Sequence, residues 1–155
     1  MKNIILIIAA FLLISNAAFS QKVAEAKVPA EVKTAFKAKF PTATKVGYEM
    51  EKNDYEISFM KDGAECSANF DKTGKWLETE IELTNAQIPV TVKATLDKEF
   101  AGYKINESVI LETPGAAKLY EFEVSKGSSK FEVQLAADGK LVKKEPIGKE
   151  SEEED

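Results

Sequence analysis

The sequence predicts an α+β fold in which two tandem α-β-β-β-β repeats form antiparallel sheets, most simply one continuous eight-stranded sheet with both helices packed on one face. Three observations lead to this prediction. The chain repeats itself, because 28–33 (VPAEVK) returns as 88–93 (IPVTVK) and 70–77 (FDKTGKWL) returns as 135–142 (LAADGKLV). Within each copy, apolar residues first recur about every four positions and then every two, which is the change from helix to strand. Pairs containing Gly, Asn or Asp separate the period-two segments, as hairpin turns do.

The first twenty residues, 1–20, are typical of a signal peptide. Lys2 supplies a positive start, an apolar run follows over 4–14, and small residues at Ala18 and Ser20 suit cleavage before Gln21. The alternative is a membrane anchor, which needs about twenty apolar residues. We therefore expect an exported chain with no membrane insertion after cleavage, located in the periplasm or secreted.

The remaining chain divides into three expected parts. Repeat 1 occupies residues 21–84 and repeat 2 occupies 85–147. The last eight residues, 148–155, contain five acids and cannot bury apolar surface, so we expect a disordered acidic tail.

Each repeat is expected to open with one amphipathic helix. Pro29 and Pro89 stand where a helix accepts proline, in the first turn, and Pro41 ends the first helix because proline disfavours helical geometry in the preceding residue. The apolar stripes of the two helices are Val28, Val32, Phe36 and Phe40, then Ile88, Val92, Leu96 and Phe100.

Four strands follow each helix. In repeat 1 we expect them near 45–50, 55–60, 64–70 and 75–83, and in repeat 2 near 104–111, 119–126, 130–136 and 140–145.

Alternation along the strands sorts their side chains into two faces. The face expected to meet the helices carries Tyr55, Ile57, Phe59, Cys66, Ala68, Phe70, Leu77, Ile81, Leu83, Tyr120, Phe122, Val124, Phe131, Val133, Leu135 and Val142. The opposite face, expected to be open to water, carries Glu56, Ser58, Met60, Glu65, Ser67, Asn69, Glu78, Glu80, Glu121, Glu123, Lys130, Glu132, Gln134, Lys143 and Glu145.

Composition argues against several classes of function. All 21 basic residues are lysine, there is no histidine, and the 26 acids outnumber the bases, so nucleic acid is an improbable partner. Without histidine and with one cysteine, the chain has no Ser-His or Cys-His nucleophile system and no thiolate cluster for a metal, and we expect neither enzyme activity nor a cofactor. Cys66 is expected to be a small buried apolar side chain, with a reactive thiol as the alternative.

Two features could support binding. Trp76, the only tryptophan, alternates onto the polar face, and its counterpart in repeat 2 is Leu141. The alternative is that Trp76 packs over the sheet edge or on the other repeat. Acidic rows on the same face could dock a basic partner or weakly bind calcium, or they could be plain solvated surface. The candidate binding residues are Trp76, Met60, Glu56, Glu78, Glu80, Leu141 and Glu123.

Several short motifs resemble a known family. They are the Val-Pro or Ile-Pro helix start, the Phe40-Pro41 helix exit, the strands 55–59 (YEISF) and 120–124 (YEFEV), and the Gly-Lys hairpins. Together they resemble the secreted beta-lactamase-inhibitor-like, PepSY-like proteins found mainly in Bacteroidota. The resemblance implies a shape similar to a proteinaceous beta-lactamase inhibitor, no catalytic residues, and a link to the inhibition or chaperoning of peptidases outside the cytoplasm.

The combined expectation is a non-enzymatic exported binding module that contacts another envelope or secreted protein through the polar sheet face. The alternative is a periplasmic protein that binds a small ligand or a cation on the same acidic face or between the repeats. The oligomeric state stays open.

Overall fold

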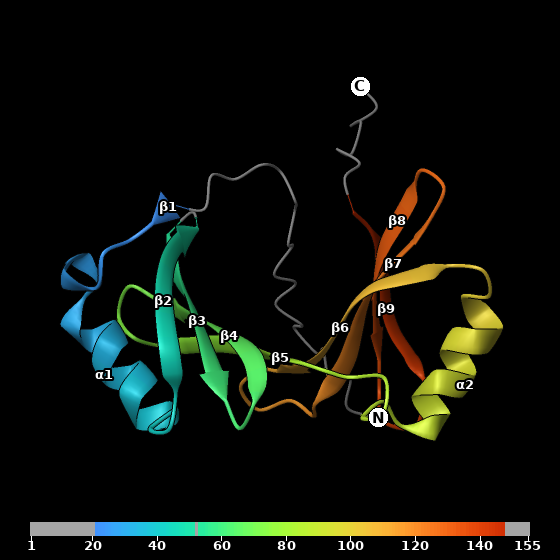
Figure 1. Ribbon diagram of the computed structural model, residues 1–155, viewed down its shortest axis with the longest axis horizontal. Coiled ribbons are helices and arrows are strands. Elements are labelled where there is room, and N and C mark those ends of the chain that lie inside the picture. Colours follow the sequence, from blue (N-terminus) through green and yellow to red (C-terminus); the bar gives the residue numbers. More distant parts are fainter. Residues whose placement is uncertain (1–20, 52, 148–155) are drawn as a thin grey trace, which may run out of the picture.

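A computed structural model describes residues 21–51 and 53–147. They form one antiparallel sheet whose strands follow chain order from β1 to β9, with the two helices at opposite ends of the molecule (Figure 1). The predicted α+β fold with two helix-and-strand repeats in one continuous sheet is confirmed. The elements are β1 (Gln21–Lys22), η1 (Glu25–Lys27), α1 (Ala30–Lys39), β2 (Thr44–Glu51), β3 (Asp54–Lys61), β4 (Ala64–Asp71), β5 (Trp76–Glu82), α2 (Val90–Glu99), β6 (Lys104–Glu112), β7 (Leu119–Lys126), β8 (Ser129–Leu135) and β9 (Leu141–Pro146).

The sheet of the described residues has nine strands rather than the predicted eight, because the two-residue strand β1 was not expected. Two residues are too short to show a period-two pattern. Internal repetition explains β1: the Val23 N–H donates to the carbonyl of Tyr48 (2.9 Å) just as the Leu83 N–H donates to the carbonyl of Ser108 (2.8 Å). β1 therefore takes the place beside β2 that the end of β5 takes beside β6.

Both helices begin directly after a proline and end directly before the last residue of the apolar stripe, Phe40 or Phe100. Pro29 and Pro89 are the residues directly before the first turns, one position earlier than expected. At the other end of α1, the N–H of Phe40 donates to the carbonyl of Phe36 (2.8 Å), and Phe100 repeats this bond to Leu96 (2.9 Å). The chain then leaves the helix and enters the first strand of its repeat.

Each helix covers its own half of the sheet, and each half has its own core. The first core holds Val28, Val32, Phe36, Phe40, Ile57, Phe59, Cys66, Ala68 and Phe70. The second core holds Leu83, Ile88, Val92, Leu96, Phe100, Phe122, Val124, Val133 and Leu135. Ile81 packs on the first core and pairs with Ile110, which packs on the second, so both helices lie on the same face of the sheet.

The burial of Cys66 agrees with the expectation of a small core side chain. It is 7% exposed, and desolvation raises the pKa of its thiol. A raised pKa disfavours the reactive thiolate.

Glycines fix the β4–β5 and β8–β9 hairpins against the helices. Gly74 and Gly139 have φ of +83° and +85°, and an added Cβ would lie 2.7 Å from the carbonyl oxygen of Glu31 and 2.5 Å from that of Thr91, respectively. Only glycine permits both the left-handed backbone and this close approach. Each hairpin tip therefore rests on the first turn of the helix of its own repeat.

Three expectations fall outside the described residues: the signal peptide at 1–20, its cleavage before Gln21, and the acidic tail at 148–155. In the described part, neither helix has the length and hydrophobicity needed to cross a membrane.

Candidate functional site

The polar side chains gather on the sheet face opposite the helices, as predicted. Cross-strand pairing places Glu56, Asn69 and Glu78 in one row and Ser67 beside Glu80 in the next. In repeat 2, the corresponding rows run from Glu121 through Gln134 to Lys143, and from Glu123 through Glu132 to Glu145. We call this surface the acidic face; its members are Glu56, Ser67, Asn69, Glu78, Glu80, Glu107, Glu121, Glu123, Glu132, Gln134, Lys143 and Glu145.

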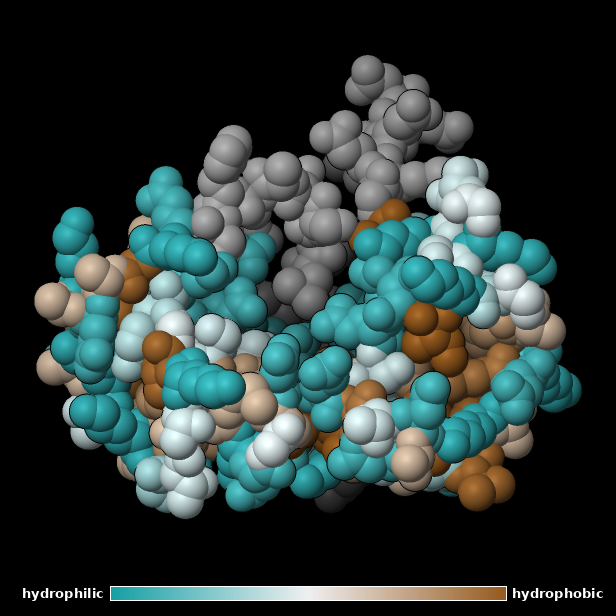
Figure 2. Space-filling model, in the orientation of Figure 1, coloured by the Kyte–Doolittle hydropathy of each residue, from teal (hydrophilic) through white to brown (hydrophobic). Residues whose placement is uncertain are grey.

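The acidic face is concave. Glu56 on β3 interacts electrostatically with Glu107 on β6, and Glu78 on β5 with Glu132 on β8. In a flat sheet, strands three places apart lie roughly 14 Å from each other, and bending of the face brings such carboxyls closer together. Figure 1 shows the two halves of the sheet inclined to each other about β5 and β6, and Figure 2 shows hydrophilic residues on both flanks of the hollow between them.

Part of this face is buried, which corrects the expectation that it is open to water throughout. Glu121 and Gln134 are each 9% exposed. Val109 and Leu111, which pair across to Glu121 and Glu80, belong to the same face and are also buried. The sequence alternation identified the face correctly, but the curvature of the sheet decides how much water reaches it.

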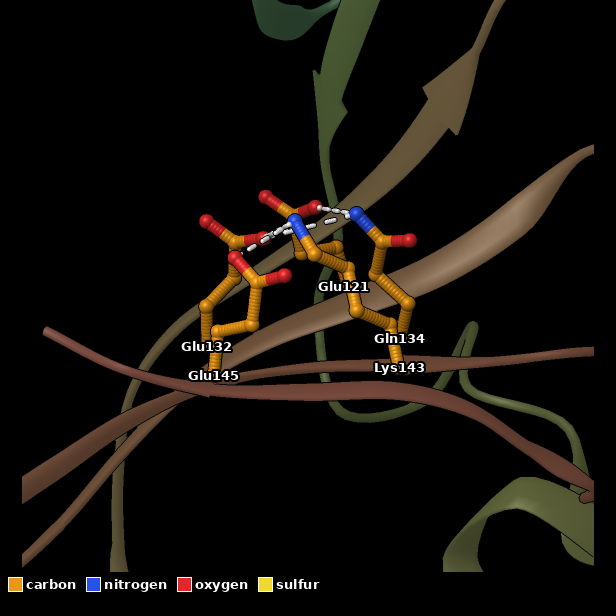
Figure 3. A network of polar contacts seen from close by, with 5 residues as sticks. All are labelled: Glu121, Glu132, Gln134, Lys143 and Glu145. Atoms are coloured by element: carbon orange, nitrogen blue, oxygen red, sulfur yellow. Dashed lines mark hydrogen bonds and ion pairs between the residues drawn. The ribbon is translucent and has the colours of Figure 1, made fainter. Parts of the chain in front are cut away.

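In repeat 2, the acidic face contains its own cation (Figure 3). Lys143 on β9 donates to Glu132 and to Glu145, with both N–O distances at 3.1 Å. Gln134 donates to Glu121 over 2.7 Å and reaches Glu132 at 3.4 Å. Glu123 pairs with Lys130 at 2.8 Å. Glu123, Glu132 and Glu145 therefore each have a cation within the chain, whereas Glu107 and Glu121 form no ion pair in the described residues.

In repeat 1, Glu78 and Glu80 on the same face accept hydrogen bonds from neutral donors. Asn69 Nδ2 donates to Glu78 over 2.8 Å, and Ser67 Oγ donates to Glu80 over 3.2 Å. A neutral hydrogen bond stabilises a carboxylate less than a charged one does.

Desolvation and mutual repulsion raise the pKa of several carboxyls of the acidic face. Burial is the main cause for Glu80, whose pKa rises to about 8, and repulsion by Glu121, Glu78 and Glu107 adds to it. Burial likewise raises the pKa of Glu121 to about 7, with Glu132 contributing repulsion. The same two causes raise the pKa values of Glu56, Glu78 and Glu107.

Five of the seven predicted binding residues lie on this side of the sheet. Glu56, Glu78, Glu80 and Glu123 belong to the rows described above. Met60 pairs with Glu65 at the far end of β3, on the same side. Their role in binding stays a prediction.

Trp76 does not lie on the acidic face, so its predicted orientation was wrong. A bulge between Asn69 and Phe70 brings Trp76 opposite Phe70, and its ring packs against the first core. The indole N–H donates to the carbonyl of Glu78 (2.6 Å) and to Thr79 Oγ1 (2.9 Å). Lys39 Nζ stands 3.3 Å from the ring centre, a cation–π contact with α1.

The equivalent bulge in repeat 2 moves Leu141 in the same way. Leu141 pairs with the core residue Leu135 on the helix side and is 43% exposed, so it too is absent from the acidic face. Val142, expected to point toward the helix, is 45% exposed, because it is the extra residue of this bulge. One inserted residue reverses the alternation on which both predictions rested.

The structure adds residues that the predicted site did not include. Glu107 and Glu121 repel the carboxylate of Glu80, and Gln134, Glu132 and Lys143 belong to the network of Figure 3. Alternation had placed all but Glu107 on this face. Their burial and the repulsion between them depend on which side chains meet across the strands, which no local pattern reveals.

The acidic side chains and the cysteine are not arranged to bind a metal ion in the part of the chain that the structure describes. In residues 21–51 and 53–147, no three acidic or thiol side chains are grouped so that they could hold an ion.

Several solved structures share this fold. A BLIP-like protein from Bacteroides fragilis NCTC 9343 matches with a TM-score of 0.71 and 24% identity, over 81% of this chain and 92% of that one. A DUF2874 family protein from Bacteroides uniformis ATCC 8492 matches with a TM-score of 0.70 and 20% identity, over 76% and 88% of the two chains. A protein from Bacteroides eggerthii DSM 20697, described among "putative periplasmic proteins", gives a TM-score of 0.70 and 19% identity, over 77% and 89%.

No curated protein matches the sequence. The family described as "Putative beta-lactamase-inhibitor-like, PepSY-like" matches it twice, over residues 18–67 and 55–143, so that the two matches together span nearly the whole of both repeats. The resemblance expected from the motifs is therefore confirmed, and this chain belongs to the beta-lactamase-inhibitor-like, PepSY-like family.

Proposed function

We propose that this protein is a non-enzymatic exported binding module that holds another envelope or secreted protein against its acidic face, in the manner of a peptidase inhibitor. One observation carries the proposal. Both repeats contribute carboxylates to a single concave surface, and several of these carboxyls have raised pKa values because burial and like charge oppose their ionisation. Such charges destabilise the free protein, and a complementary partner would relieve that cost.

The family and its members support the binding role. The family is described as beta-lactamase-inhibitor-like, and the relative from Bacteroides fragilis is described as BLIP-like. An inhibitor of this kind acts by surface complementarity and needs no reacting group of its own. Export is supported by the apolar amino-terminal run and by the periplasmic description of the relative from Bacteroides eggerthii.

The chemistry of the chain supports the absence of catalysis. The sequence contains no histidine, and its single cysteine lies in the first core. Glu80 and Glu121 have the raised pKa values that acid catalysts need. However, the pKa values of Glu78 and Glu107, which lie beside Glu80, are raised as well. A hydrolase pair requires one carboxyl that stays ionised beside one that does not.

The proposal is tested by capture from an envelope extract, followed by measurement with the purified partner. We expect one partner to bind the wild-type protein at a defined stoichiometry and to bind Glu80→Lys at least about tenfold more weakly. Asp97→Lys on the exposed side of α2 makes the same change of charge away from the acidic face and should bind as the wild type does. Equal binding by all three proteins would place the contact elsewhere. Inhibition assays with beta-lactamases and extracytoplasmic peptidases then identify the partner's class.

A further inference from the structure

The two repeats carry opposite charges at matching positions of the acidic face. A shift of 65 residues superposes their pairing, since Asn69 opposite Glu78 corresponds to Gln134 opposite Lys143. The same shift relates Glu80 to Glu145. The two halves of this face therefore share one pattern of strand pairing and differ in the side chains that the strands carry.

Two lysines on this side of repeat 2, Lys143 and Lys130, correspond to glutamates in repeat 1. Lys143, which joins Glu132 to Glu145, corresponds to Glu78. Lys130, which pairs with Glu123, corresponds to Glu65. Repeat 2 therefore carries a cation at each of these two places, whereas repeat 1 carries a carboxylate.

Glu56, Glu78 and Glu80 in repeat 1 differ in this respect from Glu123 and Glu132 in repeat 2, which do form ion pairs. Within residues 21–51 and 53–147, no lysine forms an ion pair with Glu56, Glu78 or Glu80. Lys143 attracts the Glu78 carboxylate and so lowers its pKa. This effect is smaller than that of burial and of repulsion by Glu132, so the pKa of Glu78 stays raised. The hydrogen bonds from Asn69 and Ser67 satisfy the oxygens without cancelling the charge.

We propose that the repeat 1 half of the acidic face receives a lysine or arginine side chain from a basic segment of the protein partner, in the place that Lys143 occupies in repeat 2. This inference rests on the proposed function and specifies the chemistry of the partner. Internal comparison supports the position, because the same backbone frame holds a cation beside Glu145, the counterpart of Glu80 (Figure 3). Glu132, which also binds Lys143, corresponds to Ser67, whose hydroxyl oxygen can accept from an incoming cation. Charge complementarity supports the occupant, because a basic segment would relieve repulsion that this chain leaves uncompensated.

Cation binding should release protons. Glu80 faces Glu78 on its own strand, Ser67 on β4, Glu107 on β6 and Glu121 on β7, and none of these groups is cationic. The pKa of Glu80 is about 8 and that of Glu121 about 7, so both carboxyls are partly protonated near pH 7. An arriving cation favours the ionised form and lowers both pKa values, which expels protons.

The test uses hexalysine as the probe and compares three forms of the full chain at low salt by isothermal titration calorimetry. Glu65→Lys with Glu78→Lys gives repeat 1 the lysines of repeat 2. The control, Glu31→Lys with Asp97→Lys, makes the same change in net charge on exposed helix positions. Circular dichroism and thermal unfolding establish that each protein is folded.

We expect hexalysine to bind the wild type and the control, and to bind the Glu65 and Glu78 variant about tenfold more weakly. Binding to the wild type should weaken with added salt, and the measured heat should depend on the ionisation enthalpy of the buffer because protons are released. The carboxyl of Glu80, followed by NMR titration without any peptide, should have a lower pKa in the Glu78→Lys background than in the wild type.

Three results would overturn the inference. They are no binding of hexalysine to the wild type, equal losses in the variant and the control, or an unchanged Glu80 titration when Glu78 is lysine. The proposed function is judged separately. A captured partner that loses affinity with Glu80→Lys but not with the lysine-bearing repeat 1 variant would leave the binding role standing and refute the cationic contact.

Discussion

Replacing Glu80 by glutamine should stabilise the protein, and the gain should grow with pH. Ser67 can still donate to the glutamine oxygen, as it does to the carboxylate at 3.2 Å, so the main change is the loss of a buried charge. The pKa of Glu80 is raised from 4.5 to about 8 in the folded protein. The folded state therefore keeps a proton that the unfolded chain releases, and stability falls as the pH rises from about 4.5 to about 8.

The magnitude follows from the size of this shift. A rise of three to four pKa units corresponds to about 4–5 kcal/mol as an upper limit. Glu80 titrates together with Glu121, Glu78 and Glu107, and the surroundings relax when it ionises, so about 2–3 kcal/mol is the realistic gain at pH 9. Below pH 4.5 the wild-type carboxyl is protonated in both states, and the gain should vanish.

Urea unfolding followed by Trp76 fluorescence measures this gain at pH 5, 7 and 9. The exposed Glu31→Gln on α1 serves as the matched control, with an expected change within about 0.5 kcal/mol at every pH. A stability difference between Glu80→Gln and the wild type that stays constant from pH 5 to pH 9 would refute the reasoning, because it would show that Glu80 ionises freely in the folded protein.

Three further changes test the parts of the structure that hold the acidic face in place. Lys143→Met removes the only cation of the network in Figure 3 and should destabilise the protein by about 1–3 kcal/mol at pH 7, with a smaller loss at pH 4, measured by urea unfolding. Gly74→Ala should lower the free energy of unfolding by at least about 2 kcal/mol, measured by thermal unfolding. Gly63→Ala is the control, because Gly63 has a similar φ but no atom within 4 Å of the new Cβ, and it should cost about 1 kcal/mol. Equal losses would contradict the close packing of the hairpin on α1. Lys39→Met should change the emission of Trp76 and lower stability by up to about 1 kcal/mol, and an unchanged spectrum would mean that the cation–π contact does not persist in solution.

Much of the fold could be predicted because its determinants are local and occur twice. The helix stripes, the positions of the prolines and the hairpin turns each act over a few residues, and the second copy confirmed the reading of the first. The face that carries Glu56 and Glu121 was assigned correctly for the same reason, since a strand without interruption alternates strictly. Strand β1 was missed because two residues carry no period.

The candidate site was predicted only in part. Trp76 and Leu141 were placed on the wrong face because one extra residue at each bulge reverses the alternation, and nothing in FDKTGKWL or LAADGKLV marks that extra residue before the strands are paired. Lys143 was visible in the sequence as one more polar residue, and its position between Glu132 and Glu145 appeared only once β8 and β9 were aligned.

The sequence by itself determined the duplication, the order of helices and strands, and the side of the sheet on which most residues lie. These properties depend on periodicity and on short turns, which neighbouring residues decide. Only the tertiary structure decided which carboxylates lose their water and repel one another. Desolvation and charge repulsion depend on distances through space, and the bending of the sheet between its two repeats sets those distances.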